Sequence, residues 1–123
     1  MKPASSNGNP ADFLPLPPAT FHIMLALADG ERHGYSIMQE VTQRTDGAFK
    51  LGPGSLYGSI KKMVEAGWIE ETDARPDPGL DDERRRYYKL TQFGERVLRA
   101  EASRLSALVN IARERGLVGG NAS

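Results

Sequence analysis

The stretch Gly52–Gly67, GPGSLYGSIKKMVEAG, predicts a helix with one apolar and one polar side. Pro53 stands where helices often begin and Gly67 where they often end. At about 100° per residue, four apolar residues gather on one side. The opposite side is small, hydroxylated and basic, with no acid before Glu65. The apolar side holds Leu56, Ile60, Met63 and Val64, the polar side holds Ser55, Gly58, Lys61 and Lys62, and Tyr57 and Ser59 flank it.

Two further helices are predicted before this stretch. Pro17 and Pro18 open a nearly continuous apolar run over residues 21–28, which is typical of a buried helix. Residues 34–45 form a second amphipathic segment, and Gly47 ends it.

A hairpin and a long helix are predicted after it. Trp68 and Ile69 lead a short strand, and residues 86–90 alternate as a second strand does. The turn-rich residues between them predict a long, mobile tip. Thr91 can cap a last helix that runs from about Gln92 to Arg115.

Apolar residues in the last helix recur as a heptad seam, which indicates that it packs along another surface. We expect a second copy of the same helix to supply that surface, although the seam could also pack back on its own domain. The predicted dimer interface consists of Val97, Leu98, Ala102, Leu105, Leu108, Val109 and Ala112.

The order of these elements predicts a mainly α fold with a small β-hairpin: a winged helix-turn-helix followed by a long C-terminal dimerisation helix. In such a fold the third helix lies in the DNA major groove and the hairpin, or wing, reaches the adjacent backbone. We expect a disordered tail over 1–12, the winged domain over 13–91, the dimerisation helix over 92–116 and a second tail over 117–123.

Net charge is zero, with 16 basic and 16 acidic residues, and a strongly basic domain would be expected for nucleic acid. The distribution is uneven. Residues 48–64 carry three lysines and no acid, residues 65–83 carry eight acids and one arginine, and residues 84–100 carry six cations and one acid. The two basic segments coincide with the third helix, including its lead-in, and with the second wing strand, although an ordinary mixed surface would also account for them.

Several function classes are disfavoured. The chain has no cysteine and only two histidines, His22 and His33, so we expect no metal and no cofactor. Ser55 lacks the G-x-S-x-G surroundings of a hydrolase nucleophile, and GPGSLYG lacks the lysine of a phosphate loop, so we expect no catalytic residues and no enzyme. No apolar run nears the roughly 20 residues of a membrane span, and the N-terminus lacks a signal-peptide pattern, so we expect a soluble cytoplasmic protein.

Four short motifs, in order and at matching spacings, resemble the PadR-like transcriptional regulators. They are His33-Gly34-Tyr35, Gly54-Ser55-Leu56-Tyr57, Glu65-Ala66-Gly67-Trp68-Ile69, and Arg86-Tyr87-Tyr88-Lys89-Leu90-Thr91 with Gly94. The resemblance covers about residues 14–115. It implies a bacterial, DNA-binding homodimer, usually a repressor, of the short type with a single C-terminal helix. Some members sense small molecules, so an unidentified effector is a further expected partner; no motif here marks its pocket.

The resemblance and the basic face together predict the residues that contact double-stranded DNA. Gly58 departs from the family, which commonly has proline there, and the acids Asp81–Glu83 at the wing tip would repel phosphates. The neutral charge also suits a different class, a winged-helix protein-interaction module that does not bind DNA. The predicted DNA-contacting residues are Tyr35, Lys50, Ser55, Tyr57, Gly58, Ser59, Lys61, Lys62, Arg85, Arg86 and Lys89.

Overall fold

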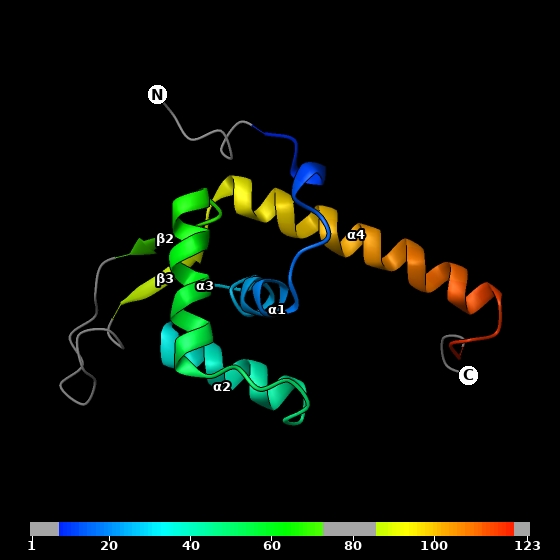
Figure 1. Cartoon of the computed structure of the whole chain (residues 1–123), viewed down its shortest axis with the longest axis horizontal. Helices are drawn as coiled ribbons and strands as arrows, with labels where there is room; N and C mark the ends of the chain where they lie inside the picture. Colours follow the sequence, from blue (N-terminus) through cyan, green and yellow to red (C-terminus); the bar gives the residue numbers. More distant parts are fainter. Residues whose placement is uncertain (1–7, 73–85, 120–123) are drawn as a thin grey trace.

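A small antiparallel sheet lies to one side of the packed helices in the computed structural model, which describes residues 8–72 and 86–119 (Figure 1). Every helix predicted from the sequence is present within two residues of its expected ends. The elements are η2 (Pro10–Phe13), α1 (Pro18–Ala26), β1 (Arg32–His33), α2 (Gly34–Arg44), α3 (Pro53–Ala66), β2 (Ile69–Thr72), β3 (Tyr87–Leu90) and α4 (Gln92–Glu114).

The sheet has three strands in the order β1-β3-β2, where two were predicted. β2 and β3 are the predicted hairpin, with Ile69 opposite Leu90, and its tip falls outside the described residues. β1 was missed because two residues are too few for a pattern of alternation. It is defined by its pairing with β3, in which Arg32 lies opposite Tyr88 and His33 opposite Tyr87.

The core forms around α1, which Figure 1 shows end-on with α2, α3 and α4 around it. Ile23 and Met24 are fully buried, as the apolar run predicted. The buried apolar residues are Leu16, Ile23, Met24, Ala26, Leu27, Ile37, Val41, Leu51, Leu56, Ile60, Met63, Ile69, Tyr88, Phe93, Val97 and Leu98.

The ends of α3 and α4 are set by the residues that the sequence singled out. Gly67 ends α3 in the left-handed conformation, with φ of 81°, which glycine adopts at little cost. Thr91 caps α4, because its hydroxyl accepts a bond from the N–H of Gly94 at 2.9 Å and donates one to the carbonyl of Gly67 at 2.6 Å. A Cβ at Gly94 would overlap the carbonyl oxygen of Trp68. The start of α4 is thereby tied to the end of α3.

A buried carboxylate joins the N-terminal segment to α4. Glu101 is 2% exposed, and its Oε2 accepts a bond from the N–H of Leu16 at 2.9 Å. Arg104 donates to Oε1 at 2.6 Å, and this hydrogen bond is the main reason that the pKa of Glu101 lies below its usual range. Residues 10–12, expected in the tail, instead belong to η2, which lies against α4.

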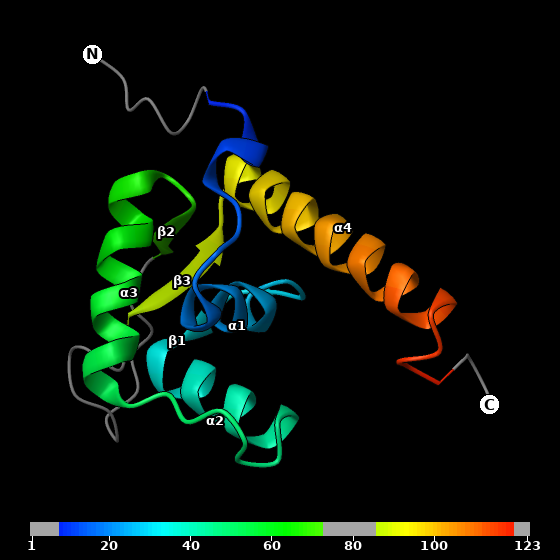
Figure 2. The ribbon, with the colours of Figure 1, turned by 45° about the vertical axis from the view of Figure 1, so that its right-hand side comes forward.

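Beyond Glu101, α4 extends away from the rest of the fold (Figure 2). Val97 and Leu98 lie in the core, whereas Leu108, Val109 and Ile111 are 51%, 41% and 44% exposed. Within the described ranges, no helix is long and apolar enough to cross a membrane. The second half of α4 thus carries apolar side chains that the described residues leave exposed.

Candidate nucleic-acid interface

The outward side of α3 is the small, basic surface that the sequence predicted. Leu56, Ile60 and Met63 anchor the helix in the core, at no more than 3% exposure. Lys61 and Lys62 are exposed, and within the described part of the chain neither forms an ion pair. Val64, predicted on the apolar side, is 39% exposed. We call this outward surface the α3 face; its exposed members are Gly54, Ser55, Gly58, Lys61 and Lys62, with half-buried Ser59 beside them.

Tyr57 and Gly34 lock α3 against the start of α2. A Cβ at Gly34 would lie 2.5 Å from the Tyr57 hydroxyl and 2.9 Å from its ring, so any larger residue here would require the Tyr57 side chain to shift. His33 precedes Gly34 and caps α2, because its Nδ1 accepts from the N–H of Ser36 at 3.1 Å. Tyr35 follows and is 37% exposed. The His33-Gly34-Tyr35 motif thereby sets how α2 meets α3.

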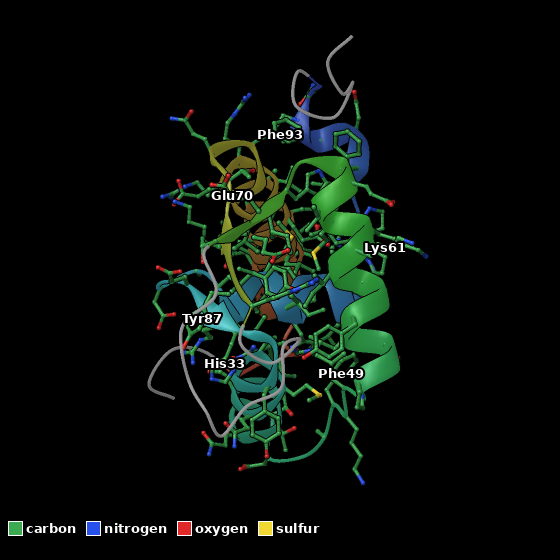
Figure 3. All side chains as sticks on the ribbon, turned by 90° about the vertical axis from the view of Figure 1, so that its left-hand side faces the viewer. His33, Phe49, Lys61, Glu70, Tyr87 and Phe93 are labelled. Carbon is green, nitrogen blue, oxygen red and sulfur yellow. The ribbon has the colours of Figure 1, made fainter. Side chains whose placement is uncertain are left out.

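The loop between α2 and α3 is held to α1 beside exposed Lys50. Phe49 stacks on His22, with ring centroids 4.4 Å apart. Arg44 contacts the Nδ1 of His22 at 3.0 Å and pairs with Glu40 at 2.7 Å. Burial, followed by the charge of Arg44, lowers the pKa of His22. Phe49 lies near the N-terminal end of α3 (Figure 3), and Lys50 is the residue that follows it in the chain.

The two wing cations within the described residues, Arg86 and Lys89, are paired with acids across the hairpin. Arg86 lies 3.5 Å from Glu71, and Lys89 lies 3.7 Å from Glu70. Arg85, also predicted to contact DNA, falls outside the described residues.

The two wing pairs occupy different faces of the sheet. Arg86, Glu71 and buried Tyr88 line a groove against Tyr57 and Lys61 of α3. Side chains alternate along strands, and Lys89 and Glu70 line a separate hollow beside the start of α4. Figure 3 shows Glu70 on the sheet and Lys61 pointing away from it on α3. The structure thus places Arg86, but not Lys89, beside α3, where Lys61 is the one member of the α3 face that lines the same groove.

The predicted dimer interface divides in two. Val97 and Leu98 are buried in the core of the single chain, so they are not available to a second copy. Ala102 is exposed, and Leu105 and Ala112 are half-buried. We call Ala102, Leu105, Leu108, Val109, Ile111 and Ala112 the α4 face.

Sequence reasoning missed three acidic residues that matter here. Glu70 and Glu71 were counted only within an acidic stretch, although their cross-strand partners follow once the register of the hairpin is known. Glu101 lies four residues after Val97, on the same side of the helix. An acid on a buried stripe is the signal that could have identified it.

This arrangement defines a winged helix-turn-helix protein that ends in a single long helix. A sequence model described as the transcriptional regulator PadR-like family matches residues 23–100, well over half of the chain. The chain belongs to the PadR-like family of transcriptional regulators.

Similar proteins show how far the likeness extends. An uncharacterized 37.1 kDa transposon protein of Streptomyces fradiae is 34% identical over 86 residues, which cover 70% of this chain. The match spans 22% of that protein's length.

Two solved structures show the same fold. A PadR family transcription regulator from Clostridium difficile has a TM-score of 0.62 at 22% identity, covering 78% of this chain and 95% of that one. Bacillus subtilis PadR in complex with operator DNA has a TM-score of 0.60 at 21% identity, covering 70% of this chain and 46% of that one.

Proposed function

We propose that this protein is a transcriptional repressor that binds a pseudo-palindromic DNA operator as a homodimer. The observation that carries the proposal is the α3 face, a rigidly anchored helix surface with small residues and two lysines. Small residues let the helix backbone approach the duplex, and the lysines supply the charge that phosphate binding requires. The solved complex of Bacillus subtilis PadR with operator DNA supports it, since that protein has the same fold.

In the proposed complex, α3 enters the major groove. Ser55 and Ser59 are placed to reach base edges, and Lys61 and Lys62 to reach bases or phosphates. Tyr35 lines a pocket with Leu51, which precedes α3, and Lys50 is the residue before Leu51. Arg86 borders the middle of α3 from the wing. Lys89 lies on the other face of the sheet, so we leave it out of the proposed contacts.

The α4 face would join two copies. Three of its large apolar residues are at least 41% exposed in the single chain. Burying one such side chain contributes roughly 1.5–3 kcal/mol, and a two-fold axis counts each contact twice. A second α4 is the partner that the heptad spacing fits.

The proposed dimer also offers a route to regulation. The two α4 helices would set the separation and angle of the two α3 faces. A small-molecule effector that altered their crossing would misplace both faces together and release the operator. Such a repressor acts where its DNA is, in the cytoplasm.

Selection of binding sites from random duplex DNA, followed by titration with the selected site, tests the proposal. Lys62→Ala should weaken binding and reduce the salt slope by about 1 if Lys62 contacts phosphate. If it reads a base, preference at one position should relax by about 1–3 kcal/mol. Arg99→Ala is the control, because this exposed cation lies on α4 and pairs with Glu95. Failure to enrich any sequence would contradict the proposal.

A protein-interaction module is the second candidate, and the pairing of the wing cations with Glu70 and Glu71 favours it. Cations that already pair with acids of the same hairpin have less charge to offer a phosphate. This candidate predicts that affinity for duplex DNA stays negligible even at low salt. Salt-dependent binding would exclude it.

A further inference from the structure

An ion pair lies at the edge of the α3 face, between Arg86 and Glu71. The Nε atom of Arg86 is 3.5 Å from Oε2 of Glu71, and the side chains are 53% and 45% exposed. Both line the groove whose opposite wall includes Tyr57 and Lys61. A carboxylate therefore lies beside Arg86 in the groove between the wing and α3.

A second ion pair on the same two strands faces the other way. Nζ of Lys89 is 3.7 Å from Oε2 of Glu70, with 52% and 53% exposure. This pair lines the hollow beside the start of α4, together with Gln92 and Glu95. The two pairs are similar in length and exposure but lie on different faces of the sheet.

We propose that Glu71 competes with DNA for Arg86: its carboxylate holds the guanidinium in the free protein, and a phosphate displaces it on binding. This inference rests on the DNA-binding function proposed above and names a residue that sets the affinity of that site. Exposed ion pairs contribute little net stability, so separating Arg86 from Glu71 costs little free energy. A guanidinium also suits phosphate, because both carboxylate and phosphate accept its two parallel N–H bonds.

The exchange has a measurable consequence for salt dependence. A cation that neutralises a phosphate releases counterions and steepens the slope of log affinity against log salt by about 0.9. When Arg86 leaves Glu71, however, the freed carboxylate stands unpaired beside the phosphates and attracts a cation from solution. This cation uptake by Glu71 offsets the release of counterions from the DNA. A neutral residue at position 71 removes the offset.

The test compares Glu71→Gln with Glu70→Gln, which removes the same charge from the same strand on the other face. Each protein is titrated into a labelled mixed-sequence duplex of about 40 base pairs, roughly four helical turns, at about 50 and 200 mM potassium chloride. Compared with wild type, Glu71→Gln should bind severalfold more tightly at the lower salt. It should also lose about three- to fourfold more affinity across the range, the equivalent of one added phosphate contact. Glu70→Gln should stay within about twofold of wild type, because solvent screens exposed charges at a distance.

Equal effects of the two substitutions would overturn the proposal, because they would reflect net charge alone. Unchanged or weaker binding by Glu71→Gln would overturn it as well.

Arg86→Gln supplies an independent test: it should weaken binding more in the Glu71→Gln background than in wild type, and equal losses would contradict the competition. Wild-type protein that binds no duplex would instead refute the proposed DNA-binding function, which separates the two failures.

Discussion

The two halves of α4 carry similar apolar side chains but have opposite environments. In the first half, Phe93, Val97 and Leu98 are at most 7% exposed and belong to the core. In the second half, Leu108, Val109 and Ile111 are at least 41% exposed. Glu101, with its bond to Leu16, stands at the boundary.

The comparison shows that one heptad pattern can serve two purposes. Packing on its own domain and packing on a second copy are therefore not mutually exclusive for this helix. The first half of α4 does pack on its own domain. The second half has no surface within the described chain to pack on, which leaves the second copy as our proposal for it.

The largest expected loss of stability comes from placing a charge in the first half of α4. Val97→Asp would bury an uncompensated carboxylate, which costs about 3–5 kcal/mol. Thermal unfolding should show a midpoint lower by more than about 10 °C. A midpoint within a few degrees of wild type would mean that this half of the helix is not part of the core in solution.

A smaller loss of stability is expected at Glu101, between the two halves of α4. Glu101→Gln keeps the size of the side chain but loses the charge that Arg104 and Leu16 bond to, at a cost of about 1–3 kcal/mol. The folded-state pKa of Glu101 is lowered, so its ionised form stabilises the fold above the unfolded-state value, which is ordinarily about 4.5. This contribution is lost as the pH falls through the folded-state pKa.

Chemical denaturation at a series of acidic pH values separates the charge from the size of Glu101. Below the ordinary glutamate range, the stability of wild type should fall more steeply than that of Glu101→Gln. Parallel curves would show that the carboxylate does not stabilise the fold through its charge.

The smallest effect on the free energy of unfolding is expected from a substitution in the second half of α4. The same substitution should have the greatest effect on assembly of the proposed dimer. Val109→Asp repeats the substitution made at Val97, on the same helix, at an exposed position. The free energy of unfolding of the single chain should change by no more than about 0.5 kcal/mol, while sedimentation should show that the dimer dissociates. A Val109→Asp protein that sediments like wild type would place the contact between copies elsewhere.

Much of the fold was predictable because its boundaries are marked by residues with strong local preferences. Pro53 and Gly67 delimit α3, and Thr91 caps α4, for reasons that act within a few residues. β1 was not predictable, since Arg32 and His33 form a strand only through pairing with distant Tyr88 and Tyr87. The close approach of Gly34 to Tyr57 was likewise not predictable from the sequence, because it depends on where α3 places Tyr57.

The composition of the α3 face was also predictable, because one amphipathic helix determines it. The ion pairs of the wing were not predictable. The sequence shows the cations and acids of residues 65–100 as separate runs, and only the strand register brings Glu71 to Arg86 and Glu70 to Lys89. Residues that act through long-range pairing are the ones that sequence reasoning missed.

The central claim is that the α4 face joins two winged domains so that their α3 faces read DNA as one rigid pair. Titration of a selected operator, compared with the same operator carrying about five extra base pairs between its half-sites, tests this most directly, because the insertion rotates one half-site by half a helical turn. We expect affinity for the lengthened operator to fall toward the non-specific range, with Kd of about 10⁻⁴–10⁻⁶ M. Undiminished affinity after the insertion would contradict the claim.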